Sequence, residues 1–275
     1  MFRTLKVLVI SIFCIVNLAF AMELPLPVGA IDWNDTLSKR YDSTSDYIGS
    51  LVDVCRFLYG APNRAALIKF IPTFYKEYKE KRKETRCVDD ILNHVIEKYP
   101  TILAQHRNNL YRLANPHKLN IEMAAIVNEL KKRGMKQALV SNIGVDSYNY
   151  ISQKHYPSFF KNFDGGFCKN LIDPKTGKPY SSYEKLDARF FIGLRKYLND
   201  NNLIKDGQNI IFIDDNPNYI SAAQESNDGS PIKIESIQFK SGKQVWSELQ
   251  ARGLLSQDAN LSDAIQDVGI RFGIN

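Results

Sequence analysis

The chain has 275 residues, of which 44% are hydrophobic and 24% are charged, and its formal net charge is +6. This length and composition predict one or two folded domains and exclude an intrinsically disordered protein. The positive charge does not indicate a nucleic-acid partner, because lysine and arginine are spread along the chain. The densest basic run, 76–86, also contains three glutamates, so we interpret it as a solvent-exposed helix face.

The first residues have the pattern of a secretory signal peptide. Arg3 and Lys6 form a short basic start and are followed by the apolar run 7–20. The sequence Ala-Phe-Ala at 19–21 fits a cleavage site, so we predict that residues 1–21 are removed and that the protein is periplasmic or secreted. An uncleaved anchor is the alternative, but the run is shorter than the roughly 20 residues that span a bilayer. We expect no transmembrane segment after signal removal.

The hydrophobic pattern divides the rest of the chain into two parts. Residues 28–31 form a short apolar strand, and from about 45 to 114 apolar residues recur at helical spacing. From Asn120 onward, expected helices alternate with expected apolar strands, a pattern that predicts an α/β fold with a doubly wound parallel sheet. The expected strands are 137–140, 166–168, 209–213 and 234–239; the expected helices are 121–133, 145–154, 186–198, one around 222–223, and 244–252 as the last element.

Polar residues follow three of these strands at the point where each strand ends. Asp32 follows the first strand, Ser141 and Asn142 follow the second, and Asp214 and Asp215 follow the most apolar one. Because the carboxyl ends of parallel strands line one crevice, we expect these side chains to converge. Each group alone fits an ordinary turn or helix cap. Three converging carboxylates need a cation, and oxygen ligands favour Mg²⁺.

These segments resemble the four motifs of the haloacid dehalogenase-like (HAD) hydrolase superfamily. Residues 32–37 (Asp-Trp-Asn-Asp-Thr-Leu) resemble the first motif, and 139–142 (Leu-Val-Ser-Asn) resemble the second. Residues 185–191, in which a lysine precedes an aromatic residue by six positions, resemble the third. Residues 212–217 (Phe-Ile-Asp-Asp-Asn-Pro) resemble the fourth motif. The resemblance as a whole extends over about 28–250.

The resemblance implies a domain organisation and an activity. Residues 22–39 and 119–275 would form a Rossmann-like core, and 40–118 would be inserted as an α-helical cap that closes over the substrate. The implied activity is that of a phosphatase, which acts on a small phosphorylated substrate through an aspartyl-phosphate intermediate. The sequence does not indicate an oligomeric state.

The resemblance also implies a role for individual residues. Asp32 would be the nucleophile, and Ser141 would hydrogen-bond the transferring phosphoryl group. Lys185 would neutralise the negative charge of the nucleophile and of the phosphoryl group. The implied catalytic residues are Asp32, Asn34, Ser141 and Lys185; the implied substrate-binding residues are Thr36, Ser141, Asn142 and Lys185; the implied Mg²⁺ ligands are Asp32, Asn34 through its backbone carbonyl, Asp214 and Asp215.

Asn34 departs from the family's phosphatases, which have a second aspartate at this position. An amide exchanges no proton at neutral pH, so a general acid–base contribution of about 10²–10⁴-fold is missing or comes from another group. A metal-free haloacid dehalogenase also lacks this carboxylate and is an alternative, although it does not need Asp214 and Asp215. A third possibility is a non-catalytic HAD-fold protein that binds a partner or ligand.

Two further assignments stay open. Lys178 precedes a proline, as in the family's common Lys-Pro pair, whereas Lys185 has the better spacing to the following helix and is favoured. Cys55, Cys87 and Cys168 remain after signal removal and show no metal-ligand spacing. An oxidising compartment would permit one disulfide among them, and we expect none of the three to be catalytic.

Overall fold

The fold is described from a computed structural model. The structure describes residues 25–40, 64–85, 87–100, 117–205 and 207–273. The predicted signal peptide lies outside these ranges, and export stays a prediction. Within these ranges, no helix is long and apolar enough to cross a membrane.

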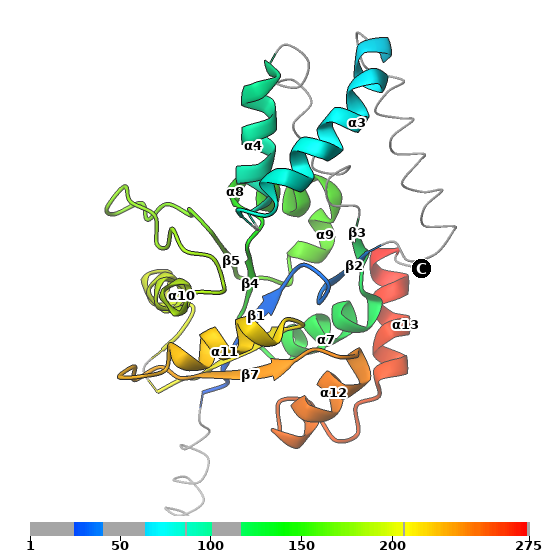
Figure 1. The fold of residues 1–275 in the computed structure, drawn as a ribbon. Helices are drawn as coiled ribbons and strands as arrows, with labels where there is room; N and C mark the ends of the chain where they lie inside the picture. Colours follow the sequence, from blue (N-terminus) through cyan, green and yellow to red (C-terminus); the bar gives the residue numbers. More distant parts are fainter. Residues whose placement is uncertain (1–24, 41–63, 86, 101–116, 206, 274–275) are drawn as a thin grey trace, which may run out of the picture.

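A five-stranded sheet forms the centre of the molecule (Figure 1). Its order is β5-β4-β1-β6-β7, and every neighbouring pair of strands is parallel. β1, which ends at Asp32, therefore lies between β4, which ends at Ser141, and β6, which ends at Asp214. The predicted α/β fold with a parallel sheet is confirmed, and the strand bounds are β1 Val28–Asp32, β4 Gln137–Ser141, β5 Gly165–Cys168, β6 Ile210–Asp214 and β7 Ile234–Gln238.

Helices cover both faces of this sheet because successive side chains of each strand point to opposite faces. In β1, Val28 and Ala30 belong to one apolar cluster and Ile31 to the other. The first cluster lies under α10 and α11, and the second under α7, α12 and α13 (Figure 1). The bounds of these helices are α7 Ile121–Lys132, α10 Ala188–Asp200, α11 Pro217–Glu225, α12 Gly242–Ala251 and α13 Leu261–Phe272.

The prediction that the last helix ends near residue 252 was wrong, because α13 follows it. The side chain of Asn260 accepts a hydrogen bond from the backbone N–H of Ser262 at the start of this helix, and Gly273 ends it with a φ of +63°. Ala264 and Val268 are buried in the cluster that includes α7. An asparagine cap, helical spacing of apolar residues and a terminal glycine are all readable in the sequence.

Two helices of the inserted segment lie above the carboxyl ends of the strands (Figure 1). α3 (Arg64–Lys81) packs on α4 (Val88–Lys98), and buried residues of both join the cluster that contains Ile31. A short pair of antiparallel strands joins this segment to the core, and the sequence did not predict it. The chain leaves the core through β2 (Ser38–Arg40) and returns through β3 (His117–Leu119). Much of 40–118 lies outside the described ranges, so the cap boundary stays a prediction.

The connection between β4 and β5 passes under α4. The helix predicted at 145–154 is α8 (Val145–Tyr150) followed directly by a π-helical turn (Ile151–His155). A short helix, α9 (Pro157–Phe160), then leads toward β5. α8 and α4 are in contact, so the inserted helices pack on the loop that follows β4.

Candidate functional site

The topology of the sheet brings the predicted polar residues to one place. Asp32 is the last residue of β1 and lies opposite Val140, one residue before Ser141 at the end of β4. On the other side of β1, Asp214 ends β6. The carboxylate groups of Asp32, Asp214 and Asp215 each have an oxygen within 4.8 Å of the others. The convergence that was predicted from three separate strand ends is therefore observed.

Lys185 is the lysine that lies among these carboxylates. Its Nζ donates a short hydrogen bond to Asp32 Oδ1 and another, of 2.6 Å, to Asp214 Oδ2. The side chain is buried, whereas Lys178 is exposed. Lys185 lies in the loop before α10, and its backbone N–H donates to Asn142 Oδ1 at 3.0 Å. This bond ties the lysine loop to the residue that follows β4.

The charges of this group are unbalanced. Burial raises the pKa of Asp32 and of Asp214, although the ammonium of Lys185 opposes the shift in both. Burial and the neighbouring Asp214 raise the pKa of Asp215 to about 6. Burial by itself would lower the pKa of Lys185, but the two carboxylates outweigh it, and the pKa lies above its usual value. When all three carboxylates are ionised, the single ammonium leaves two negative charges, which a divalent cation would neutralise.

The oxygen donors in this group fit Mg²⁺. Asp32 and Asp215 line a cavity and have oxygens that face it. Asp214 is fully buried, and its oxygens accept hydrogen bonds from Lys185 Nζ and, at 2.9 Å, from the backbone N–H of Asn216. Asp32 and Asp215 are therefore the side chains that would hold the ion, and Asp214 positions Lys185 behind them.

Thr36 lies behind the site and not on the cavity wall. Its hydroxyl accepts a 3.0 Å hydrogen bond from the backbone N–H of Asp215 and donates a 3.3 Å one to Asp215 Oδ1. Thr36 is fully buried and is not among the residues that line the cavity. The predicted substrate-binding residue thus orients a carboxylate of the cluster.

Ser141 and Asn142 differ in how they face the site. The Ser141 hydroxyl is buried and has no hydrogen-bond partner in the part of the chain that the structure describes. Asn142 lines the cavity, and its Nδ2 donates a 3.3 Å hydrogen bond to the hydroxyl of Tyr219. An unpaired buried hydroxyl costs stability, so its presence beside the carboxylates is typical of a ligand-binding position.

The loop after β1 makes a tight turn that places Asn34 on the cavity wall. Asp35 has a φ of +59°, a left-handed conformation that is uncommon outside glycine. The Ser38 N–H donates to the Trp33 carbonyl at 2.7 Å and closes the turn. Asn120 is the N-cap residue of α7, and its Nδ2 donates a 3.0 Å hydrogen bond to the Thr36 carbonyl. The turn is therefore supported by a residue distant in sequence.

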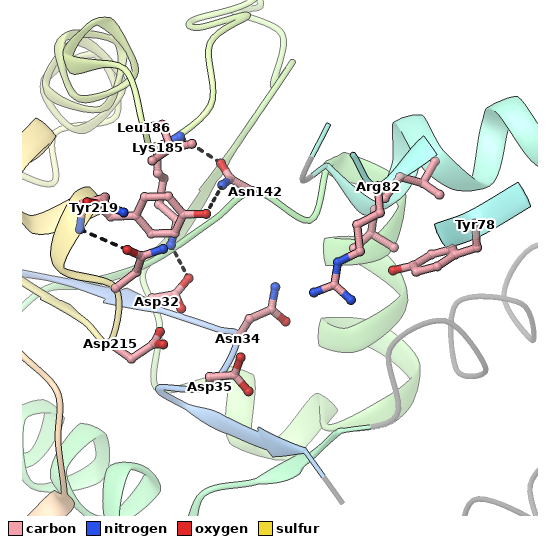
Figure 2. Close-up of a pocket in the computed structure, with 14 residues that line it drawn as sticks. Asp32, Asn34, Asp35, Tyr78, Arg82, Asn142, Lys185, Leu186, Asp215 and Tyr219 are labelled. Carbon is pink, nitrogen blue, oxygen red and sulfur yellow. Dashed lines mark hydrogen bonds and ion pairs between the residues drawn. The ribbon is translucent and has the colours of Figure 1, made fainter. Parts of the chain in front are cut away.

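The cavity has a volume of about 280 Å³ and lies between the sheet edge and the inserted helices (Figure 2). Two of its lining residues, Tyr219 and Arg82, were not predicted to belong to the site, and Arg82 comes from the run 76–86 that was interpreted as a solvent-exposed helix face. The ring of Tyr219 lies 4.7 Å from Lys185 Nζ, so its π face interacts with the ammonium. Arg82 approaches from the opposite side, beside Tyr78 (Figure 2). Neither belongs to a recognisable motif, and only the fold places them here.

Asp89 attaches the inserted helix α4 to the loop after β4. Its carboxylate accepts backbone hydrogen bonds from Asp146 at 2.8 Å and Ser147 at 3.2 Å, which caps the start of α8. Its own backbone N–H donates to the Ile143 carbonyl at 3.2 Å. A Cβ at Gly144 would lie 2.3 Å from the Asp89 carboxylate, so only glycine fits this close approach. These contacts position the start of α4 over the cavity.

The two described cysteines are not among the residues that line the cavity. Cys87 and Cys168 are buried and form no disulfide, and Cys55 lies outside the described ranges. Burial raises the pKa of Cys87 to about 12 and also raises that of Cys168. Both thiols therefore stay protonated at neutral pH, and a thiol is a poor nucleophile.

No protein-family model matches the sequence, and no curated protein is similar to it. Solved structures of HAD-superfamily hydrolases do match over most of the chain. A HAD-superfamily hydrolase from Ehrlichia chaffeensis is 18% identical, with 82% of this chain and 97% of that chain covered and a TM-score of 0.43. A haloacid dehalogenase-like hydrolase from Streptococcus pneumoniae is 13% identical (82% and 99% covered, TM-score 0.44), and a dehalogenase is 14% identical (82% and 97%, 0.43).

Proposed function

We propose that this chain is a HAD-type hydrolase and, more specifically, a magnesium-dependent phosphatase that transfers a phosphoryl group from a small substrate to Asp32. The observation that supports it most directly is the cluster of three carboxylates around one buried lysine at the carboxyl end of a parallel sheet. The cluster opens into a cavity suited to a small ligand. The four motifs identified in the sequence meet at this place.

Each residue of the site has a distinct part in the proposed reaction. A carboxylate oxygen of Asp32 attacks phosphorus, the bond to the leaving oxygen breaks, and water then hydrolyses the aspartyl-phosphate. Lys185 neutralises negative charge at the nucleophile, and the Ser141 hydroxyl donates to a phosphoryl oxygen. When bound by Asp32, Asp215 and the backbone carbonyl of Asn34, Mg²⁺ would offset the repulsion between the anionic nucleophile and the anionic substrate.

Asn34 favours a second candidate function, a metal-dependent binding protein without turnover. This residue lines the cavity where the family's phosphatases have their acid–base aspartate, and an amide cannot replace it. A panel of phosphorylated metabolites, assayed with and without Mg²⁺, separates the two. Hydrolysis that requires Mg²⁺ supports the phosphatase, whereas Mg²⁺ binding with no turnover on any compound supports the binding protein. Turnover of haloacids without Mg²⁺ would support the dehalogenase.

Asp215→Asn is expected to weaken Mg²⁺ binding at least about 100-fold, because it removes a ligand charge without changing volume. Isothermal titration calorimetry measures the affinity. Asp35→Asn is the matched control, since Asp35 lines the same cavity but does not belong to the carboxylate cluster. We expect it to change the affinity less than about fivefold. Equal affinity in the wild type and Asp215→Asn would mean that the cluster does not bind the ion.

Asn34→Asp is expected to accelerate the hydrolysis of alkyl phosphates selectively. An aryl or acyl leaving group departs as an anion, whereas an alkoxide needs a proton that Asn34 cannot donate. The wild type should therefore cleave aryl and acyl phosphates far better than alkyl monoesters. The variant should gain up to about 10²-fold in kcat/KM on alkyl esters and little on aryl esters. Similar wild-type rates on both classes, unchanged in the variant, would show that another group donates the proton.

A further inference from the structure

The cavity has a second cationic residue, Arg82, that the proposed reaction does not use. Arg82 follows the end of α3 and lines the cavity wall opposite Lys185 (Figure 2). Its guanidinium points toward Asn34, and the side chain is only half-buried. Within the described ranges, no carboxylate pairs with Arg82 and its side chain makes no hydrogen bond.

The two lysines that flank Arg82 in the sequence each have an acidic partner. Lys81 pairs with Glu84 at 2.6 Å, and Lys83 pairs with Glu80 at 2.7 Å. The acidic residues of this segment therefore neutralise the cations on either side of Arg82. The one cation of the three that faces the cavity remains available to a ligand. A guanidinium matches a carboxylate or phosphate with two parallel hydrogen bonds.

The position of Arg82 separates it from the phosphoryl site. Lys185 and the carboxylate cluster lie at the end of the sheet, and Arg82 lies beside Tyr78 on the side of the inserted helices (Figure 2). Val88 and Ile91, which come from the start of α4, are among the apolar residues that line the cavity. A ligand that fills this volume of about 280 Å³ would meet Lys185 with one end and Arg82 with the other.

We propose that Arg82 binds a second anionic group of the substrate, a carboxylate or a second phosphate, and so selects small phosphorylated acids. This inference rests on the proposed phosphatase activity, because it assumes that the phosphoryl group lies at Asp32. Arg82 is then a specificity-determining residue that lies outside the reacting atoms. It recognises the part of the substrate that leaves with the departing oxygen.

The kinetic test compares substrates that differ only in the second anion. Phenyl phosphate is the reference, 3-carboxyphenyl and 4-carboxyphenyl phosphate vary the distance to a carboxylate, and 1,3-phenylene bisphosphate adds a second phosphate. The best probe with a second anionic group should exceed phenyl phosphate about 10-fold or more in kcat/KM, as a charge-assisted hydrogen bond would give. Preference for the carboxylate or for the bisphosphate identifies which anion is bound.

Arg82→Gln should abolish this preference and leave the kcat/KM for phenyl phosphate within about threefold of the wild type. Arg82→Lys should retain part of the preference, because it keeps the charge without the planar donors. Lys83→Gln is the matched control: it removes the adjacent positive charge, which is exposed and paired with Glu80, and should leave the preference unchanged. Equal loss on all probes in Arg82→Gln would overturn the proposal and place the phosphoryl group at Arg82.

A binding measurement separates this inference from the proposed activity. Calorimetry with Mg²⁺ and the Asp32→Asn variant compares the same probes without turnover. If the probe with a second anionic group binds more tightly than phenyl phosphate and loses this advantage when Arg82→Gln is added, the role of Arg82 is supported even if the wild type hydrolyses nothing. Absence of any preference in binding would overturn it even if the wild type is an active phosphatase.

Discussion

Lys185→Met is expected to lower the free energy of unfolding by about 3–5 kcal/mol, because it leaves buried carboxylates without their cation. Lys185 is buried and donates hydrogen bonds to both Asp32 and Asp214, which are themselves buried. Methionine fills a similar volume but neutralises neither charge. Urea denaturation of the metal-free protein, followed by circular dichroism, measures the loss.

Lys178→Met is the matched control for this variant. Lys178 is exposed, so its replacement should change the free energy of unfolding by less than about 0.5 kcal/mol. The pair also tests the choice between the two lysines that the sequence left open. A loss below about 1 kcal/mol in Lys185→Met would show that Lys185 does not neutralise buried charge.

The loss in Lys185→Met should grow as the pH rises from about 5 to about 8. Burial raises the pKa of Asp32 and of Asp214 in the folded protein, and the variant lacks the ammonium that opposes this shift. The folded variant then binds more protons than the unfolded chain, so its stability falls with rising pH. Added Mg²⁺ should restore part of the stability, since it supplies the missing positive charge.

Asp32→Asn is expected to reduce turnover of any phosphorylated substrate by at least about 10⁴-fold, because the amide is not a nucleophile. The fold should persist, since Lys185 keeps its 2.6 Å bond to Asp214. Asp187→Asn is the matched control: Asp187 caps α10 through its side chain, and asparagine caps a helix equally well. That variant should retain activity.

Fluoroberyllate tests the covalent step without a substrate. This ion mimics the phosphoryl group of an aspartyl-phosphate, so with Mg²⁺ it should raise the melting temperature of the wild type. It should not stabilise Asp32→Asn, which has no carboxylate to bind it. Equal stabilisation of both proteins would refute Asp32 as the nucleophile.

The sequence by itself determined the strands of the core and the location of the carboxylates at their ends. A buried parallel strand can be identified from its own residues, because they form a short apolar run, as in 28–31 and 209–213. Because the carboxyl ends of parallel strands lie at the same edge of the sheet, three motifs that are separate in the sequence are predicted to form one site. The helix α13 was not predicted, although its cap, apolar spacing and terminal glycine are local signals in the sequence.

Only the tertiary structure decided which residues complete the site. The pairing of β2 with β3 joins segments separated by the whole inserted region, and no local pattern specifies it. The spacing to the following helix already favoured Lys185 over Lys178, but only the folded loop shows that Lys185 contacts the carboxylates. Thr36, which was expected to bind substrate, instead hydrogen-bonds Asp215. Arg82 reaches the cavity because α3 and α4 pack above the sheet, and in the sequence it is one basic residue within a charged run. Side-chain direction and long-range packing set these roles, and neither is encoded in the spacing of nearby residues.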